Sequence, residues 1–215
     1  MHSEGRQGSM QTQGLVPYAV GIGTVFLLWL LYKVASGGNI GSLYEGNDGR
    51  PSTSKFQFFA WTTVVVFAYA AIYSLKVEAH HFDAINEIPK NVLIAMGMSV
   101  ISAAAAKSIT VSYISTGRIT KSAATKDTSG FGAIFQDDSG FPDLSKVQMI
   151  AWTFIAIATY LIAVGSKIHQ RDYSSLPDID GALMVLMGLG HGAYLGKKLV
   201  TQDTTAPNAA QAAAR

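Results

Sequence analysis

The sequence contains no cysteine, and charged residues are scarce. None of its 215 residues is Cys, so disulfides, thiolate chemistry and cysteine-ligated metals are excluded. Asp, Glu, Lys and Arg make up only 14% of the chain, whereas an average soluble domain has about a quarter. The formal net charge of +2 does not indicate a nucleic-acid-binding surface. This composition favours contact with lipid or burial in a large interface.

Patterns that carry enzyme chemistry are also missing from the sequence. It has no Gly-rich phosphate loop, no nucleophile paired with a base, and no carboxylate inside an apolar run. His80 and His81 share a loop with acidic residues, but their spacing matches no metal motif, so we predict a solvated loop. We therefore expect no enzymatic activity, no catalytic residues, no cofactor and no metal.

Long hydrophobic runs, by contrast, are frequent. Five of them approach or exceed the roughly 18–20 residues that cross a bilayer as a helix, and none contains Asp or Glu. They are Leu15–Val34, Phe56–Leu75, Val92–Tyr113, Val147–Ser166 and Ala182–Val200. We predict an all-α integral membrane protein with five transmembrane helices, in a prokaryotic inner (plasma) membrane. The first helix, residues 14–36, is too long for a signal-peptide core and is expected to stay in the protein.

The distribution of Lys and Arg predicts the orientation. Alternate connecting segments carry eleven basic residues against five. Because cytoplasmic loops are enriched in Lys and Arg, the N-terminus is expected outside and the C-terminus inside.

The strongest sequence signal is an internal repeat. Residues 41–110 align without a gap to residues 132–201 at an offset of 91, with sixteen of 70 positions identical, where chance would give about five. Each copy contains two predicted helices, so the chain returns to the same side and the two units must run parallel. The remaining segments are predicted to be flexible tails, residues 1–13 and 202–215, and a cytoplasmic spacer, residues 111–131.

The densest match is a cassette before and within the first helix of each unit. Ser54 and Ser145 are expected as N-caps, the lysines as contacts of the inner leaflet, and the tryptophans as part of the interfacial aromatic belt. One interpretation is that the cassette only caps and anchors a helix. The other is that Gln and Trp meet across units or subunits as a functional junction. Its members are Ser54, Lys55, Gln57 and Trp61, with Ser145, Lys146, Gln148 and Trp152.

The string Asp48 to Thr62, with its echo at Gly140 to Thr153, resembles a cassette of uncharacterised prokaryotic multi-pass membrane proteins. The resemblance covers both units but not the first helix. No activity is associated with that cassette, so the resemblance implies a membrane repeat and nothing about function.

Small residues recur every four positions in the second helix of each unit. Such spacing gives a face where another helix can approach closely. The two faces could pack against each other in one chain or build an oligomer. They comprise Gly188, Gly192 and Gly196 in one helix and Ala95, Ser99 and Ala103 in the other.

His191 is the ionisable side chain predicted deepest in the bilayer. Intramembrane ionisable residues are costly and often functional. A pore-lining or pH-sensing role is one reading, and a structural hydrogen bond to a neighbouring hydroxyl or carbonyl is the other. Its counterpart in the first unit is Val100, so one chain cannot hold a symmetric histidine pair.

These features favour a self-associating membrane protein. The favoured function is an oligomeric channel or pore for small ions or solutes. The alternative is a structural scaffold or adaptor of a membrane-bound assembly. The expected partners are the lipid bilayer, further copies of the chain and a cytoplasmic protein, with no nucleic acid.

Overall fold

The computed structural model describes residues 4–45, 50–85, 87–116, 131–137 and 141–204. Five α-helices and two short 3₁₀ helices account for nearly all of this part of the chain. In order they are α1 (Glu4–Ala35), η1 (Ile40–Leu43), α2 (Thr53–Glu78), α3 (Lys90–Ser115), η3 (Phe131–Phe135), α4 (Leu144–Gln170) and α5 (Gly181–Thr204).

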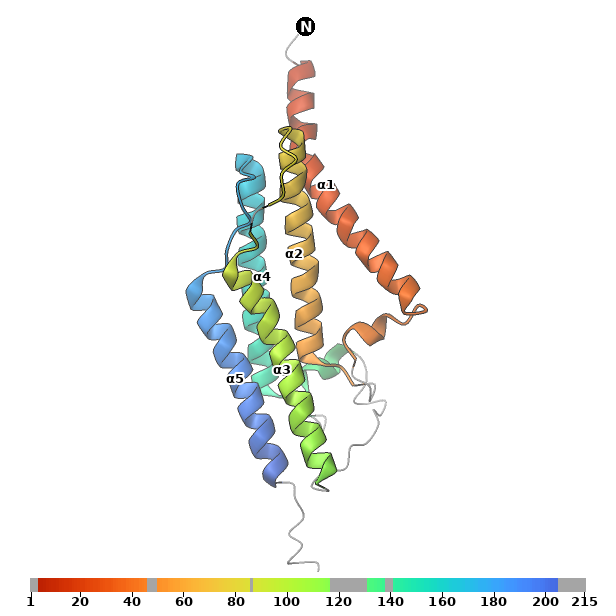
Figure 1. The fold of residues 1–215 in the computed structure, drawn as a ribbon, viewed down its shortest axis with the longest axis vertical. Coiled ribbons are helices and arrows are strands. Elements are labelled where there is room, and N and C mark those ends of the chain that lie inside the picture. The colour runs from red at the N-terminus through yellow and green to blue at the C-terminus, as the bar shows by residue number, and fades with distance from the viewer. Residues whose placement is uncertain (1–3, 46–49, 86, 117–130, 138–140, 205–215) are drawn as a thin grey trace, which may run out of the picture.

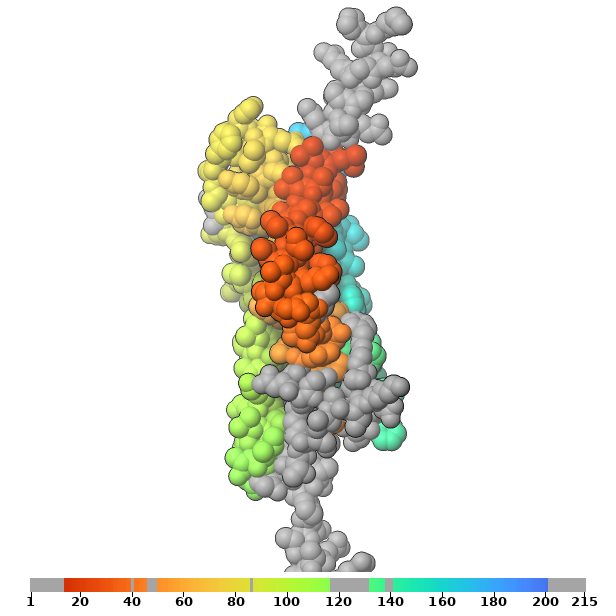
Figure 2. Space-filling model, turned by 90° about the vertical axis from the view of Figure 1, so that its right-hand side faces the viewer, coloured from red at the N-terminus to blue at the C-terminus, as the bar shows by residue number. Residues whose placement is uncertain are grey.

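Helices α2, α3, α4 and α5 form a bundle, and α1 lies against its side (Figure 1). Within the bundle α2 contacts α3 and α4, and α5 contacts α3 and α4. Helices α2 and α4 run in one direction, and α3 and α5 run in the other. Helix α1 covers the α2 side of the bundle (Figure 2) and diverges from it toward the end where α2 begins.

The prediction of an all-helical fold is confirmed for the described residues. By length and composition, Gly14–Ala35 of α1 and the whole of α2, α3 and α4 are each apolar enough to cross a membrane. Helix α5 does not reach the same hydropathy, since it contains several glycines together with His191, Lys197 and Lys198. The fifth crossing therefore stays a prediction.

Each helix extends beyond its apolar run, because polar first and last turns continue the helix outside the apolar stretch. Helix α1 begins at Glu4, inside the segment expected to be a flexible tail, and α5 ends at Thr204. Helix α3 ends at Ser115, within the expected spacer. The rest of that spacer, the distal part of the C-terminal tail, and residues 46–49 before α2 lie outside the described residues.

The expected N-caps were wrong by two positions. The Ser52 side chain accepts from the Lys55 amide at the start of α2, and the Asp143 side chain accepts from the Ser145 amide at the start of α4. Ser54 already lies inside its helix. The apolar run marks the part of a helix suited to the membrane, whereas the cap stands one polar turn before it.

Large side chains fill the bundle interior. Trp61 and Ile72 are fully buried, and Tyr160 and Met187 are almost so. The outside carries many exposed apolar residues, including Leu93, as expected for lipid contact.

Candidate functional site

The segments that precede α2 and α4, at the same end of the bundle, have the same local structure. Before α2 the chain folds back on itself through a bridge between Glu45 and Pro51, and before α4 through a bridge between Gln136 and Pro142. Each member of the second pair lies 91 residues after its counterpart in the first. Each turn is preceded by a 3₁₀ helix, η1 or η3.

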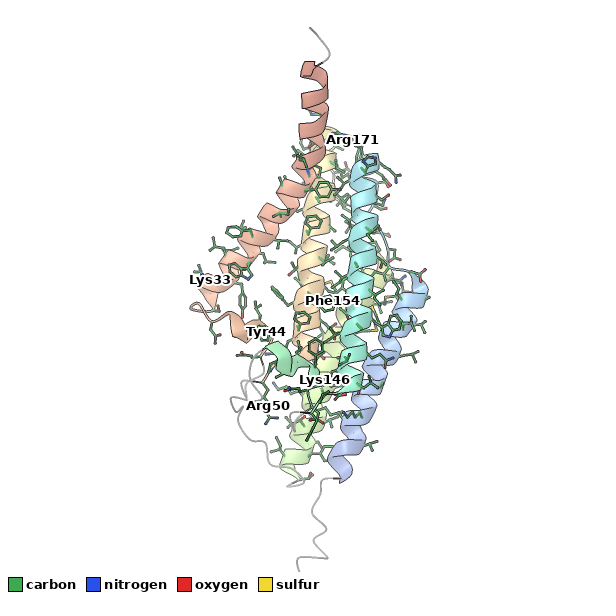
Figure 3. All side chains as sticks on the ribbon, turned by 180° about the vertical axis from the view of Figure 1, so that it is seen from behind. Lys33, Tyr44, Arg50, Lys146, Phe154 and Arg171 are labelled. Atoms are coloured by element: carbon green, nitrogen blue, oxygen red, sulfur yellow. The ribbon has the colours of Figure 1, made fainter. Side chains whose placement is uncertain are left out.

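The cassette lysines hold these turns closed. The Lys55 Nζ donates to the Glu45 carbonyl at 2.6 Å, and the Lys146 Nζ donates to the Gln136 carbonyl at 2.5 Å. Lys146 lies at the start of α4, beside η3 (Figure 3). Both ammonium groups therefore bind backbone of their own unit, a role that the sequence interpretation as lipid contacts missed.

The opposite ends of α2 and α4 also match. His80 and Arg171, again 91 residues apart, both adopt the left-handed conformation, with φ of 59° and 53°. Their amides donate to Val77 and Ile168, which closes the helix ends without a glycine. Non-glycine residues occupy this region at some cost, so its occurrence at both positions reflects the same backbone path.

A lysine–aspartate pair follows each of these helix ends. The Lys76 Nζ lies 2.7 Å from Asp83 Oδ2, and the Lys167 Nζ lies 2.7 Å from Asp172 Oδ2. The hydrogen bond from Lys76 lowers the pKa of Asp83, and that from Lys167 lowers the pKa of Asp172. The Asp83 side chain is 62% exposed and that of Asp172 is 41% exposed, so these pairs hold the loops in place and add little to stability.

The loop histidines lie near these pairs. His81 packs its ring 5.5 Å from that of Tyr173. Within the described ranges, no three His, Asp or Glu side chains are grouped so that they could hold a metal ion.

Gln57 joins the two units inside the bundle. It is fully buried, and its Nε2 donates to the Thr153 Oγ1 at 2.6 Å and to the Met149 carbonyl at 3.2 Å. Thr153 Oγ1 itself donates to the Met149 carbonyl at 2.9 Å. We call this contact the junction between the units. It pairs Gln57 with Thr153 and Met149, whereas the functional-junction interpretation expected Gln and Trp of the two units to meet.

Aromatic contacts extend this junction. The rings of Trp61 and Tyr160 meet edge to face, with centroids 6.1 Å apart. Phe154, on the side of α4 next to α2 (Figure 3), lies 6.1 Å from Phe56. Trp61 is fully buried inside the bundle, and its expected depth near an interfacial aromatic belt stays a prediction.

The second copies of the junction residues are placed differently. Gln148 is exposed and Trp152 is half-buried, although their sequence context repeats that of Gln57 and Trp61. The glutamines and tryptophans of the two units therefore do not meet each other within one chain.

His191 bonds across the other pair of helices. Its Nδ1 lies 2.7 Å from the Ser102 Oγ, which joins α5 to α3, and the histidine is only 4% exposed. Its Nε2 has no hydrogen-bond partner among the described residues. This geometry matches the structural reading of His191, namely a hydrogen bond to a neighbouring hydroxyl.

The two small-residue faces are used unequally. Ala95 and Ser99 are fully buried and Ala103 is half-buried. Gly188 is half-buried, whereas Gly192 and Gly196 are exposed, and nothing lies within 4 Å of a Cβ added to either of the last two.

The close-packed glycine of α5 is Gly190, which the sequence interpretation missed. A Cβ on Gly190 would lie 3.3 Å from the Met149 Cα. No sequence pattern marked it, because the spacing of four selected Gly188, Gly192 and Gly196 instead.

A further charged contact was also missed at the start of α4. The buried Asp143 caps the helix through Ser145, and its Oδ2 lies 3.0 Å from the Lys197 Nζ of α5. Burial raises the pKa of Asp143, but the hydrogen bonds from Ser145 and Lys197 outweigh this and hold the pKa below its usual range.

The comparisons with known proteins give no relative of this chain. No protein-family model matches it, and no curated protein or solved structure shows significant similarity to it. The resemblance of the cassette to uncharacterised prokaryotic membrane proteins therefore stays a prediction, and function must be inferred from the geometry alone.

Proposed function

We propose that this chain is a self-associating multi-pass membrane protein that acts as a structural scaffold of a membrane-bound assembly, with no enzymatic activity. The observation that carries the proposal is the filled bundle. Trp61, Ile72, Tyr160 and Met187 occupy its interior, where a solute path between the described helices would have to run. A bundle with a filled interior and an apolar surface is suited to be a structural subunit of a membrane assembly.

The proposed arrangement has five crossings, with the N-terminus outside and the C-terminus in the cytoplasm of a prokaryotic cell. Helix α5 lies beside α3 and runs parallel to it, and its 24 residues give a length of about 36 Å. That length is enough for a bilayer core. Topology reporters fused after residue 85 and after residue 204 should report opposite sides of the membrane.

We also propose that residues 41–110 and 132–201 are a parallel tandem duplication. Support comes from the matching turns, lysine contacts and left-handed helix ends at an offset of 91 residues. Two unrelated helical segments would not be expected to share these turns, lysine contacts and helix ends at one constant offset.

A pore between copies is the second candidate. It is favoured by polar side chains on one side of α4, where Gln148, Thr159 and Ser166 are all exposed. These positions are separated by 11 and 7 residues, which places them on one helical face. In an oligomer this face could line a water-filled path.

Reconstitution separates the two candidates. The purified chain is placed in liposomes, and both its oligomeric state and its permeability to small ions are measured. The scaffold predicts oligomers without ion flux, and a pore predicts flux that Gln148→Leu reduces. A chain that stays monomeric at all protein-to-lipid ratios would contradict both.

A further inference from the structure

The contacts between the two units are one-sided. We use unit 1 for residues 41–110 and unit 2 for residues 132–201, and we call two residues counterparts when they lie 91 positions apart. The residues of unit 1 that bind unit 2 include Thr53, Phe56, Gln57, Trp61, Asn91 and Ser102. Their counterparts form the tail face, all exposed except the half-buried Trp152: Leu144, Val147, Gln148, Trp152, Ala182 and Ala193.

The same holds in the other direction. The residues of unit 2 that bind unit 1 include Ile134, Met149, Thr153, Tyr160, Ile179 and His191. Their counterparts form the head face, and each of them is exposed or half-buried: Leu43, Phe58, Thr62, Tyr69, Ile88 and Val100.

This pattern is that of a head-to-tail interface. A two-fold relation would use the same surface on both units, so Gln148 would bind unit 1 as Gln57 binds unit 2. Instead Gln57 is fully buried and Gln148 is exposed. A head-to-tail interface leaves one binding surface unused at each end, and these are the head face and the tail face.

The head face already contains the hydrogen-bonding groups that the tail face needs. Thr62 Oγ1 donates to the Phe58 carbonyl at 2.8 Å, as Thr153 Oγ1 donates to the Met149 carbonyl at 2.9 Å. The latter pair accepts the amide of Gln57. Gln148 on the tail face has the same side-chain amide as Gln57. The chain therefore carries a second donor, at Gln148, and a second set of acceptors, at Thr62 and the Phe58 carbonyl.

Chemistry is also matched at two of the places where the second copies differ from the first. The polar pair Ser102 and His191 has the counterparts Ala193 and Val100, which are both apolar. Thr53 donates to the Ile134 carbonyl. The counterpart of Thr53 is Leu144, which is 79% exposed, and the counterpart of Ile134 is Leu43, so neither counterpart side chain is polar. Contact between the tail and head faces would thus strand none of these polar side chains.

Helix α1 leaves Phe58 and Thr62 of the head face accessible. It packs closely on α2 where Gly21 meets Phe67. It then diverges from the half of α2 that carries Phe58 and Thr62 (Figure 1), and Phe58 is 42% exposed.

From these observations we propose that the tail face of one copy of this chain binds the head face of a second copy, with Gln148 donating to Thr62 and to the Phe58 carbonyl. The contact repeats between chains the interface that joins unit 1 to unit 2 within a chain. It rests on the proposed self-association and specifies its geometry. Each chain then binds two neighbours, one through each face.

The absence of cysteine allows a direct test. Full-length Thr62→Cys and Gln148→Cys chains are co-reconstituted in liposomes and treated with a short thiol-specific crosslinker. We expect a crosslinked dimer from the mixture and a ladder of multiples from the double variant. Val185→Cys, at a 63% exposed position of α5, replaces Gln148→Cys as the matched control and should give no product above background with Thr62→Cys.

Self-association is measured in parallel, from the dilution dependence of energy transfer between labelled wild-type chains. Loss of the glutamine bond in Gln148→Met should weaken it about threefold. Self-association without a crosslink above the control would overturn the head-to-tail contact and leave the scaffold standing. Chains that do not associate would overturn both proposals.

Discussion

Replacing Gln57 by Met removes a buried amide while keeping nearly the same side-chain volume. The change deletes the hydrogen bonds from Nε2 to the Thr153 hydroxyl and to the Met149 carbonyl. A hydrogen bond between membrane helices contributes on average about 0.6 kcal/mol and at most about 1.7 kcal/mol. Thr153 keeps its own bond to the carbonyl, so no acceptor is left stranded. We therefore expect a loss of about 1–2 kcal/mol in the free energy of unfolding.

Gln148→Met is the matched control, because it makes the same chemical change at an exposed position. In monomeric chains it should alter the free energy of unfolding by less than about 0.5 kcal/mol. A double-mutant cycle between Gln57→Met and Thr153→Val should give a coupling of about 0.6 kcal/mol, since the two side chains share one bond.

Steric trapping in lipid bilayer discs measures these free energies without a denaturant. A coupling indistinguishable from zero, together with equal effects of the two glutamine substitutions, would refute the placement of Gln57 at the junction.

Three further outcomes are expected. Gly190→Leu should destabilise the bundle strongly, because its side chain would enter the backbone of α4, whereas Gly192→Leu should leave the free energy of unfolding of the monomer nearly unchanged. Asp143 has a lowered pKa in the folded chain, so its contribution to stability is present above its unfolded pKa of about 3.9 and is lost as the pH falls through its folded pKa. Unfolding titrations of Asp143→Asn should therefore show a weaker dependence on acid. An unchanged profile would exclude the ion pair with Lys197. Ser102→Ala leaves the histidine Nδ1 without its partner and should cost about 1–3 kcal/mol, measurable by the same trapping assay, and no loss would contradict that bond.

The helices could be predicted from the sequence because a membrane crossing requires a long apolar run, and such runs are plain in the chain. Four of the five expected crossings satisfy that requirement in the structure. Helix ends were harder to predict, since polar turns extend each helix past its apolar part. The caps at Ser52 and Asp143 show this, because they stand before the residues that pattern alone selected.

Which face of a helix is buried could not be predicted. In a soluble helix the apolar stripe marks the core, but α2 is apolar on nearly every side and shows no such stripe. Gln57 and Gln148 occur in the same local sequence, yet one is buried and the other is exposed. Their difference arises from tertiary contacts that a local pattern does not record. The glycine spacing failed for the same reason, because it selected Gly192 and the contact falls on Gly190.

The start of α2 and the start of α4 lie at the same end of the bundle, and each is preceded by its own closed turn. A helical pair of this kind returns the chain to its point of departure. Gene duplication could therefore add a third pair after Thr201 without reversing the side on which the chain finishes. Growth in steps of two helices leaves earlier segments correctly inserted, so this architecture can change its copy number during evolution while its topology stays constant.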